Sequence, residues 1–282
     1  MENNEWIKFC EKQIPELKNI YKKQTGKDLD LSNCKTLTEK IQWLKIYDSN
    51  PLKIKCSDKI LVREYCKSKL GVDLFIPIIS VWNSFDEIDF EKLPNDYVLK
   101  TNHGSHTNII VKNNNIDKTI AKRKFDEWLS KDWSWYGKEM AYYPIKRKIF
   151  AEQFVKDKNE GELTDYKFLC FNGEPKFVQV FNDRNTKKFH LNYYDMNFNF
   201  VDISRTDIPN NKNFLDKKPS QFELMKEYAK TLAQDFNFVR VDFYEINNIV
   251  YLSELTFFPA AGFCKYKDEK TDLMLGNMLN LN

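Results

Sequence analysis

The second half of the chain consists largely of strand-forming segments joined by tight turns. Asn172-Gly173 and Asn247-Asn248 each separate two runs of strand-forming residues. Asparagine and glycine tolerate the positive φ angles of two-residue hairpin turns better than other residues do. We therefore expect two antiparallel hairpins, one over residues 165–182 and one over residues 238–257.

The first half is expected to mix helices and strands. Apolar residues recur at helical spacing between Leu37 and Leu70, and Gly71 is typical of a helix end. Further helices are expected over residues 118–129 and 221–235, and the last twenty residues are expected to be a polar helical tail. The remaining expected strands are residues 75–82, 97–102, 109–111, 148–155 and 190–196.

The composition excludes several functional classes. With 42% hydrophobic residues in a chain of 282, a sizeable core is possible, yet no stretch is apolar enough to span a membrane. Lys and Arg total 44 against 41 Asp and Glu, which argues against a nucleic-acid-binding protein. Only eight glycines are present, so several Gly-rich nucleotide loops are not expected. The charged first twenty residues do not look like a targeting segment, and we expect a cytoplasmic protein.

Cysteines and histidines limit the kinds of metal site. The six cysteines are scattered without a Cys-x-x-Cys pair, which is typical of reduced, packed thiols. Only three histidines occur in the sequence. A metal ion would therefore have to be held by oxygen ligands.

The final hairpin contains two carboxylates within otherwise apolar strands. The turn at Asn247-Asn248 places Asp242 and Glu254 opposite each other to within one residue of register. Two carboxylates this close repel each other unless a cation or a shared proton lies between them. Mg²⁺ suits the pair, because it takes one or two protein carboxylates together with substrate phosphates and water. The alternative is a structural ion pair, in which Arg240 or a lysine neutralises them.

Three more charged residues lie within apolar strands. Lys100 leads into the polar turn at residues 103–108, where an ammonium group and turn amides can hold phosphate oxygens. Lys167 repeats this position in a later strand, and Glu152 can accept hydrogen bonds from ribose hydroxyls. For each of them the alternative is a solvated residue at a sheet edge.

Two aromatic segments, residues 133–136 and 142–143, favour either a sugar-stacking surface or a local part of the core. The sequence pattern does not distinguish between these two roles.

In their order along the chain, these features resemble the ATP-grasp superfamily, and more closely its teichuronopeptide-biosynthesis branch, which is found with capsule and cell-wall polysaccharide genes. The segments that carry the resemblance are residues 37–44 (LTEKIQWL), 57–59 (SDK), 99–105 (LKTNHGS), 165–168 (DYKF), 171–175 (FNGEP), 239–242 (VRVD) and 253–256 (SELT). The resemblance implies an α+β ATP-grasp fold. Its parts would be a helical N-terminal region at 1–72, a small lobe at 73–147 and a large lobe with the metal site at 148–282.

The resemblance also implies where ATP binds. The nucleotide would be clamped between the two lobes, with Lys100 and Lys167 reaching its phosphates. Glu152 and the backbone near Phe154 and Val155 would take the adenine and ribose side.

The same resemblance assigns the metal and the reacting groups. Asp242 and Glu254 would bind magnesium, and Arg240 would steady the transferred phosphoryl group and the later tetrahedral centre. Lys59 stands where the family presents a basic residue toward the cleft. Many ATP-grasp ligases have an asparagine two residues after the second metal ligand, whereas this chain has Thr256, so a direct third ligand is not expected.

Members of this fold usually phosphorylate a carboxylate with ATP, and an amine then attacks the acylphosphate to form an amide. We therefore expect an ATP- and Mg²⁺-dependent carboxylate–amine ligase that acts on a uronic acid of a capsular or cell-wall polysaccharide or its precursor, with a small amine as the second substrate. No Gly-x-Ser-x-Gly motif is present, in agreement with chemistry that needs no side-chain nucleophile. The alternatives are an ATP-grasp phosphotransferase acting on a sugar hydroxyl and a non-catalytic nucleotide- or glycan-binding module.

Overall fold

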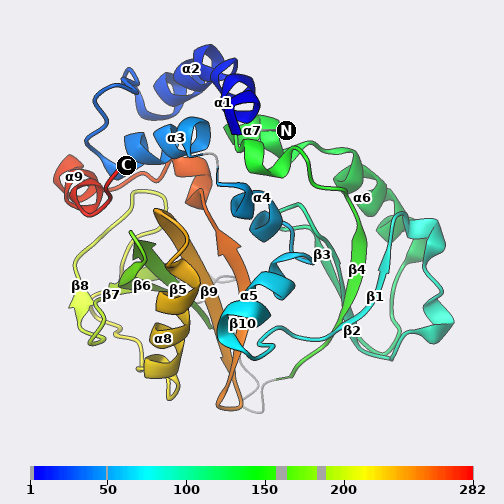
Figure 1. The fold of residues 1–282 in the computed structure, drawn as a ribbon. Helices are drawn as coiled ribbons and strands as arrows, with labels where there is room; N and C mark the ends of the chain where they lie inside the picture. Colours follow the sequence, from blue (N-terminus) through cyan, green and yellow to red (C-terminus); the bar gives the residue numbers. More distant parts are fainter. Residues whose placement is uncertain (1–2, 49, 157–163, 183–188, 282) are drawn as a thin grey trace.

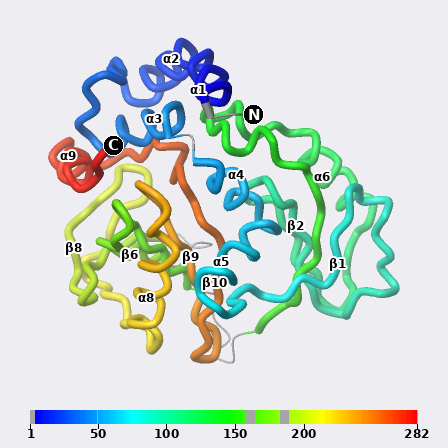
Figure 2. Tube along the Cα trace, viewed as in Figure 1, coloured from blue at the N-terminus to red at the C-terminus, as the bar shows by residue number. Residues whose placement is uncertain are grey.

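Two antiparallel β-sheets and the helices around them make up the protein. The structure, a computed structural model, describes residues 3–48, 50–156, 164–182 and 189–281 (Figure 1). The larger sheet and the smaller sheet lie on opposite sides of the molecule, with helices α4 and α5 between them. The trace in Figure 2 shows the first helices and the C-terminal helix together at one end. The mixture of separate helices and antiparallel sheets confirms the expected α+β class.

The smaller sheet has four strands in the order β1-β4-β2-β3, and every neighbouring pair is antiparallel. Its strands are β1 (Ile78–Trp82), β2 (Tyr97–Thr101), β3 (Asn108–Val111) and β4 (Ile149–Gln153). Helix α6 (Lys118–Ser130) packs on this sheet through Phe125, in a core that includes Tyr97 and Leu99. Between α6 and β4 the chain forms the short helices α7 (Trp133–Gly137) and η3 (Met140–Tyr142).

Strand β4 belongs to the smaller sheet, although the expected boundary assigned every residue after 147 to the large lobe. Ala151 of β4 pairs with Leu99 of β2 on one side and with Ser80 of β1 on the other. The chain therefore crosses to the larger sheet only after Gln153. Alternating apolar residues identify a strand, but they do not show which sheet it joins, because its pairing partners lie far away in the sequence.

The larger sheet has six strands in the order β10-β9-β5-β6-β7-β8, again all antiparallel. Its strands are β5 (Asp165–Phe171), β6 (Glu174–Asn182), β7 (His190–Tyr194), β8 (Phe200–Val201), β9 (Phe238–Ile246) and β10 (Ile249–Thr256). Helix α8 (Phe222–Ala233) covers one face, where Phe222 stacks near Phe168. Because side chains alternate along a strand, Lys167 points to the opposite face.

Both expected hairpin turns are confirmed. Asn172 and Gly173 have φ angles of 48° and 82°, and Asn247 and Asn248 have φ angles of 54° and 64°. All four angles are positive, as a two-residue turn that follows the twist of the strands requires. The second turn fixes the pairing of β9 with β10, the two strands that carry the expected metal ligands.

The N-terminal region is helical, as expected. Its helices are α1 (Asn3–Glu11), α2 (Ile14–Thr25), α3 (Leu37–Tyr47), α4 (Pro51–Ser57) and α5 (Val62–Leu70). Thr36 begins α3 with a capping box, in which its side chain accepts from the Glu39 backbone N–H and the Glu39 carboxylate accepts from the Thr36 N–H. Gly71 ends α5 in the left-handed conformation, with φ of 70°. Within the described ranges, no helix has the length and apolar character needed to cross a membrane.

The C-terminal helix α9 (Glu269–Asn277) packs against the start of α3. A Cβ atom at Gly276 would lie 2.1 Å from the Lys35 carbonyl oxygen, so only glycine permits this approach. Lys40 of α3 also donates to the carbonyl oxygens of Gly276 and Leu279. These contacts hold the helical N-terminal region against the segment that follows the larger sheet.

Candidate functional site

The hairpin of β9 and β10 brings Asp242 and Glu254 together. From Ile249 to Leu252 the strands pair in one register, and a bulge at Ser253 then shifts the register by one residue. The shift places Glu254, rather than Ser253, directly opposite Asp242. The two carboxylates therefore lie on the same face of the sheet, as the sequence predicted to within one residue.

Asp242 is the buried centre of an ionic cluster. Its side chain is completely buried, and Lys167 on the neighbouring strand β5 donates to Oδ2 at 2.5 Å. Arg240, two residues earlier on the same strand face, donates to both carboxylate oxygens, with Nε 2.7 Å from Oδ1 and Nη2 2.6 Å from Oδ2. This bidentate geometry fixes the guanidinium plane.

Glu254 is held more loosely than Asp242 and keeps 33% of its side chain exposed. Arg240 Nη2 lies 3.3 Å from Oε1, and the Thr256 hydroxyl donates to the same oxygen at 3.1 Å. Burial would raise the pKa of Glu254, but the positive charges of Lys59, Lys167 and Arg240 outweigh burial and lower that pKa to about 2. The carboxylate is therefore ionised at all physiological pH values.

Arg240 connects the members of the cluster. Its side chain is 12% exposed and donates to Asp242, Glu254 and the Thr256 hydroxyl. Burial alone would lower the pKa of this guanidinium, but Asp242 and Glu254 raise it above its ordinary value. Thr256 orients Arg240 and Glu254, because its hydroxyl accepts from Arg240 Nη2 and donates to Glu254 Oε1.

Lys59 links the smaller sheet to this cluster. Its Nζ donates to the Gly104 carbonyl oxygen at 2.7 Å and lies 3.7 Å from Glu254 Oε2. Gly104 belongs to the polar turn that follows β2. The backbone of Lys59 also donates to the Asn102 carbonyl oxygen, and the Asn102 amide donates to Asp58. The end of α4, the turn after β2 and the end of β10 therefore meet at one point.

A second ionic group lies in the smaller sheet, around Glu152. Lys100 of β2 and Arg63 of α5 each form an ion pair with one of the two Glu152 carboxylate oxygens. The Glu152 side chain is only 8% exposed, whereas Lys100 is 31% exposed. The sequence assigned Glu152 to the adenine and ribose side of ATP. In the structure, Glu152 contacts Lys100, the lysine expected to bind the phosphates. Val155, its neighbour in that assignment, is partly buried just beyond β4.

The sequence interpretation missed Arg63. Arg63 lies on an amphipathic helix among other charged residues, and nothing in that pattern separates it from a solvated arginine. Its partner lies 89 residues away in the sequence, and only the packing of α5 against β4 brings the two together.

The interpretation also missed Gln179, for which a signal exists. The Asn172-Gly173 turn, with a one-residue register shift between Leu169 and Cys170, pairs Gln179 of β6 with Lys167 of β5, on the face that carries Asp242. Gln179 donates to the Tyr193 hydroxyl at 2.7 Å and extends the polar row across the sheet. The signal in the sequence is a polar residue, Gln179, within the otherwise apolar strand β6 and opposite Lys167.

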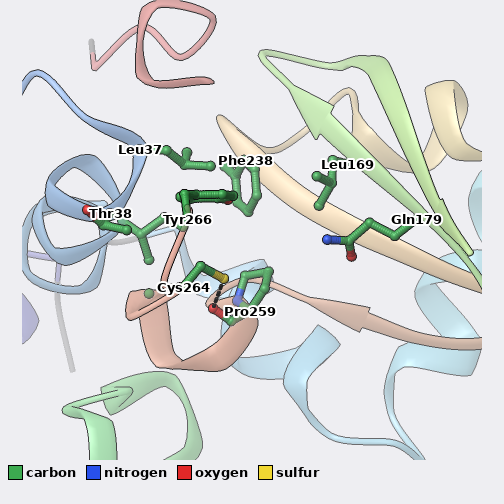
Figure 3. Close-up of a pocket in the computed structure, with 10 residues that line it drawn as sticks. Leu37, Thr38, Leu169, Gln179, Phe238, Pro259, Cys264 and Tyr266 are labelled. Carbon is green, nitrogen blue, oxygen red and sulfur yellow. Dashed lines mark hydrogen bonds between the residues drawn. The ribbon is translucent and has the colours of Figure 1, made fainter. Parts of the chain in front are cut away.

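Beside this row lies a small, mostly apolar pocket between the larger sheet and α3 (Figure 3). Gln179 and Leu169 reach it from the sheet, and Pro259 and Cys264 reach it from the segment after β10. Its other lining residues are Leu37, Thr38, Ile41, Phe238, Gly262 and Tyr266. No lysine or arginine lines the pocket, so its chemistry does not match a phosphate-binding site.

The donor atoms of the cluster fit a hard divalent cation. Asp242, Glu254 and Thr256 present oxygen atoms at one end of the hairpin, and Mg²⁺ binds oxygen ligands. Among the residues that the structure describes, no group of three or more His, Cys, Asp or Glu side chains forms a metal-binding cluster. The two carboxylates are balanced here by Arg240 and Lys167, the structural ion pair that the sequence left open as an alternative.

Two α+β parts, each contributing a lysine, and paired carboxylates in the last hairpin agree with the ATP-grasp class that the sequence resembles. A family model described as TupA-like ATPgrasp matches residues 39–280. The chain therefore belongs to the TupA-like ATP-grasp family, and the ATP-grasp fold assignment is confirmed.

The chain is weakly similar to several solved structures. D-alanine–D-alanine ligase from Helicobacter pylori is 18% identical with a TM-score of 0.45, and the match covers 86% of this chain and 69% of that chain. The Bacillus anthracis enzyme complexed with ATP is 13% identical, with a TM-score of 0.44 and coverage of 72% and 55%. N5-carboxyaminoimidazole synthetase from Staphylococcus aureus is 14% identical, with a TM-score of 0.43 and coverage of 80% and 52%.

This chain thus spans about half to two thirds of the length of these structures. The similarity to them is weak, and the family match alone carries the assignment. No curated protein matches the sequence.

Proposed function

We propose that the protein is an ATP-dependent carboxylate–amine ligase that forms an amide through an acylphosphate. The observation that carries the proposal is the cluster around Arg240, where two carboxylates and two lysines meet beside the turn after β2. This cluster concentrates positive charge and oxygen ligands at one place, as phosphoryl transfer requires.

ATP would lie between the two sheets, with Lys100 and Lys167 on its phosphates. The lysines come from different sheets, so a ligand that contacts both must bridge the two parts of the molecule. Glu152 orients Lys100 in the free protein and, together with the backbone at Val155, would face the ribose and adenine. Arg63 stays beside Glu152 and balances its charge when Lys100 turns to a phosphate.

Asp242 and Glu254 would hold a magnesium ion against the phosphates. A bound magnesium ion neutralises phosphate oxygens and polarises the phosphorus–oxygen bond. Within this chain, Asp242 would exchange its contact with Lys167 for the ion, which releases that lysine, while Arg240 keeps its bidentate contact with Asp242. Lys167 then contacts the nucleotide, and Arg240 contacts the acceptor carboxylate and the phosphoryl group in transit. Lys59 neutralises the outer oxygen of Glu254 and positions the turn at Gly104.

The reaction has two steps with these residues in place. A carboxylate oxygen of the acceptor attacks the γ-phosphorus of ATP, the bond to the bridging oxygen breaks, and ADP leaves. An amine nitrogen then attacks the acyl carbon, the carbon–oxygen bond to phosphate breaks, and inorganic phosphate leaves. Arg240 stabilises the negative charge that develops in both transition states, because its planar fork is held at a fixed orientation.

We infer that the acceptor is a uronic acid of a capsular or cell-wall polysaccharide or its precursor, and that the second substrate is a small amine. The support is the family membership together with the segments at residues 37–44, 57–59 and 253–256, which resemble polysaccharide-associated members. A cytoplasmic location would give the enzyme access to ATP and to nucleotide-sugar precursors.

The test is ADP release by the purified protein with ATP and Mg²⁺. The acceptors would be glucuronate, UDP-glucuronate and a glucuronate-containing oligosaccharide, each with and without a panel of small amines. ADP release that requires both acceptor and amine, with an amide in the product by mass spectrometry, supports the ligase. A stable phosphate ester formed without amine identifies a phosphotransferase instead, and nucleotide binding without turnover identifies a binding module.

A further inference from the structure

A second group of titratable side chains lies outside the Arg240 cluster and has no part in the chemistry above. Its members are Lys45 of α3, Glu139 between α7 and η3, and Tyr142 of η3. The group borders the turn at residues 259–262, which follows β10 directly. Lys45 contacts this turn at the Ala261 carbonyl oxygen.

Lys45 is buried, with 4% exposure, and its ammonium group has three acceptors. It donates to Gln42 Oε1 at 2.7 Å, to the Gly137 carbonyl oxygen at 2.5 Å and to the Ala261 carbonyl oxygen at 2.8 Å. These contacts use all three N–H donors. Lys45 thus acts on Glu139 through its charge and makes no hydrogen bond with it.

The turn after β10 has an unusual backbone that Lys45 and Gln42 stabilise. Ala260 and Ala261 both have φ of 50° and Gly262 has φ of 68°, so three consecutive residues are left-handed. Such a conformation is costly for alanine and persists only where surrounding contacts hold it. Gln42 Nε2 supplies one such contact by donating to the Gly262 carbonyl oxygen at 2.9 Å.

Glu139 lies against this turn. A Cβ atom at Gly137 would lie 2.5 Å from Ala261 Cβ and 3.0 Å from Glu139 Oε1. The close approach of Gly137 to Ala261 therefore places the Glu139 carboxylate next to the chain that leaves β10. Only glycine at position 137 permits this arrangement.

Tyr142 is influenced electrostatically by both Glu139 and the Arg240 cluster. Burial raises the pKa of its hydroxyl, the negative charges of Glu139 and Glu254 raise it further, and Arg240 lowers it. The hydroxyl is therefore within electrostatic reach of both groups.

The Glu139 carboxylate has no hydrogen-bond donor among the described residues. Burial raises its pKa above the ordinary value, although the charge of Lys45 acts in the opposite direction. A partly buried carboxylate without donors is costly, and a bound ammonium group would remove that cost. A raised proton affinity also suits a carboxylate that must accept a proton near neutral pH.

We propose that Glu139 binds the ammonium group of the amine substrate and takes a proton from it before the amine attacks the activated carboxylate. This proposal rests on the ligase function proposed above. Tyr142 is within electrostatic reach of both Glu139 and Arg240. Lys45 is a positioning residue that holds Gly137 and Ala261 together beside the carboxylate.

The proton balance of the step is complete. The ammonium group carries three protons, of which the first passes to Glu139 and frees the nitrogen lone pair. The nitrogen attacks the acyl carbon, and the carbon–oxygen bond to phosphate breaks. The second proton leaves the nitrogen with the departing phosphate, and the third stays on the amide. Glu139 then returns its proton to solvent.

The experiment separates the amine step from carboxylate activation. Hydroxylamine is unprotonated at neutral pH and traps an acylphosphate as a hydroxamate without needing a base. With UDP-glucuronate, ATP and Mg²⁺, Glu139→Gln is expected to keep hydroxamate formation within about twofold of the unchanged protein. Amide formation with glycine is expected to fall on the order of 100-fold, the usual contribution of a general base. Glu139→Asp should recover part of the rate.

The pH profile gives a second readout. The rate of amide formation in the unchanged protein should fall as pH falls through the titration of Glu139, because only the ionised carboxylate accepts a proton. In Glu139→Gln the rate should instead follow the deprotonation of the amine itself. The charged group acting on Glu139 is Lys45 from α3, and the neutral titratable group influenced by Glu139 is Tyr142 from η3. Glu16→Gln is the matched control. Glu16 forms an ion pair with Lys138, the residue before Glu139, so this substitution also removes one carboxylate charge close to Glu139.

Equal losses of hydroxamate and amide in Glu139→Gln would overturn the proposal. If the unchanged protein forms no hydroxamate with any uronate, the proposed function fails. The proposal for Glu139 is then tested separately, by measuring the titration midpoint of its carboxyl group with ¹³C NMR of labelled glutamate. A Glu139 titration midpoint well above 4.5, rising further in Lys45→Met, supports the base. A midpoint at or below 4.5 excludes it.

Discussion

The two lysines proposed to bind phosphate lie in parts of the molecule that balance charge differently. In the smaller sheet, Lys100 and Arg63 share one carboxylate, that of Glu152, so the group carries a net positive charge. At the larger sheet, three cations are matched by three carboxylates: Lys59, Lys167 and Arg240 against Asp165, Asp242 and Glu254. The smaller sheet can therefore attract a nucleotide phosphate directly, whereas the larger sheet must first exchange an internal ion pair.

The largest effect on turnover is expected from removing the carboxylates of the larger sheet. Asp242→Asn and Glu254→Gln should each reduce ADP release at least on the order of 100-fold at ordinary Mg²⁺ concentrations, because each removes a proposed metal ligand. Steady-state ADP release, with circular dichroism as the folding control, measures this. Near-normal turnover in either variant would mean that the larger sheet holds only a structural ion pair.

The next effect separates chemistry from binding at Arg240. Arg240→Lys keeps the charge but loses the planar fork that contacts both Asp242 oxygens. We expect kcat to fall on the order of 100-fold, about 2.7 kcal/mol, with little change in KM for ATP. An unchanged kcat with a raised KM for ATP would make Arg240 a nucleotide contact instead.

The comparison of the lysines themselves predicts different stability losses. Lys167→Ala leaves the fully buried Asp242 with Arg240 alone and should cost about 3 kcal/mol of unfolding free energy. Lys100→Ala should cost under about 1 kcal/mol, because Lys100 is 31% exposed and Glu152 keeps Arg63. Urea unfolding measures both values, and similar losses would contradict the difference between the sheets.

In calorimetric titrations, both alanine variants should weaken ATP more than adenosine, since only the phosphates meet an ammonium group. Equal losses for ATP and adenosine would show that the lysines are structural.

The smallest expected effect concerns pH. The pKa of Glu254 is lowered from 4.5 to about 2, so its ionised form stabilises the fold above pH 4.5. That contribution is lost as pH falls from 4.5 through 2, because the unfolded chain takes up the proton first. Glu254→Gln should flatten this part of the curve of unfolding free energy against pH. An unchanged acid limb would mean that Lys59, Lys167 and Arg240 do not stabilise this carboxylate.

Local patterns in the sequence account for most of the elements and for the pairing at the site. The two hairpin turns depend on residues that tolerate positive φ, and the alternation within β9 and β10 follows from one buried face. Together they place Asp242 opposite Glu254, because register within a hairpin is set by the turn between its strands. The bulge at Ser253 is the one-residue correction that the alternation alone left open.

What the tertiary structure decided is which distant segments meet. Three features join segments that are far apart in the sequence: the sheet that β4 joins, the contact of Arg63 with Glu152, and the approach of Lys45 and Gly137 to the turn after β10. Arg63 and Glu152 are 89 residues apart, and Lys45 and Ala261 are 216 residues apart. On an amphipathic helix, an arginine that is solvated and an arginine that pairs with a buried carboxylate occur in the same local sequence pattern. The physical reason is that burial and charge pairing depend on packing between elements, whereas turns and strand alternation depend only on neighbouring residues.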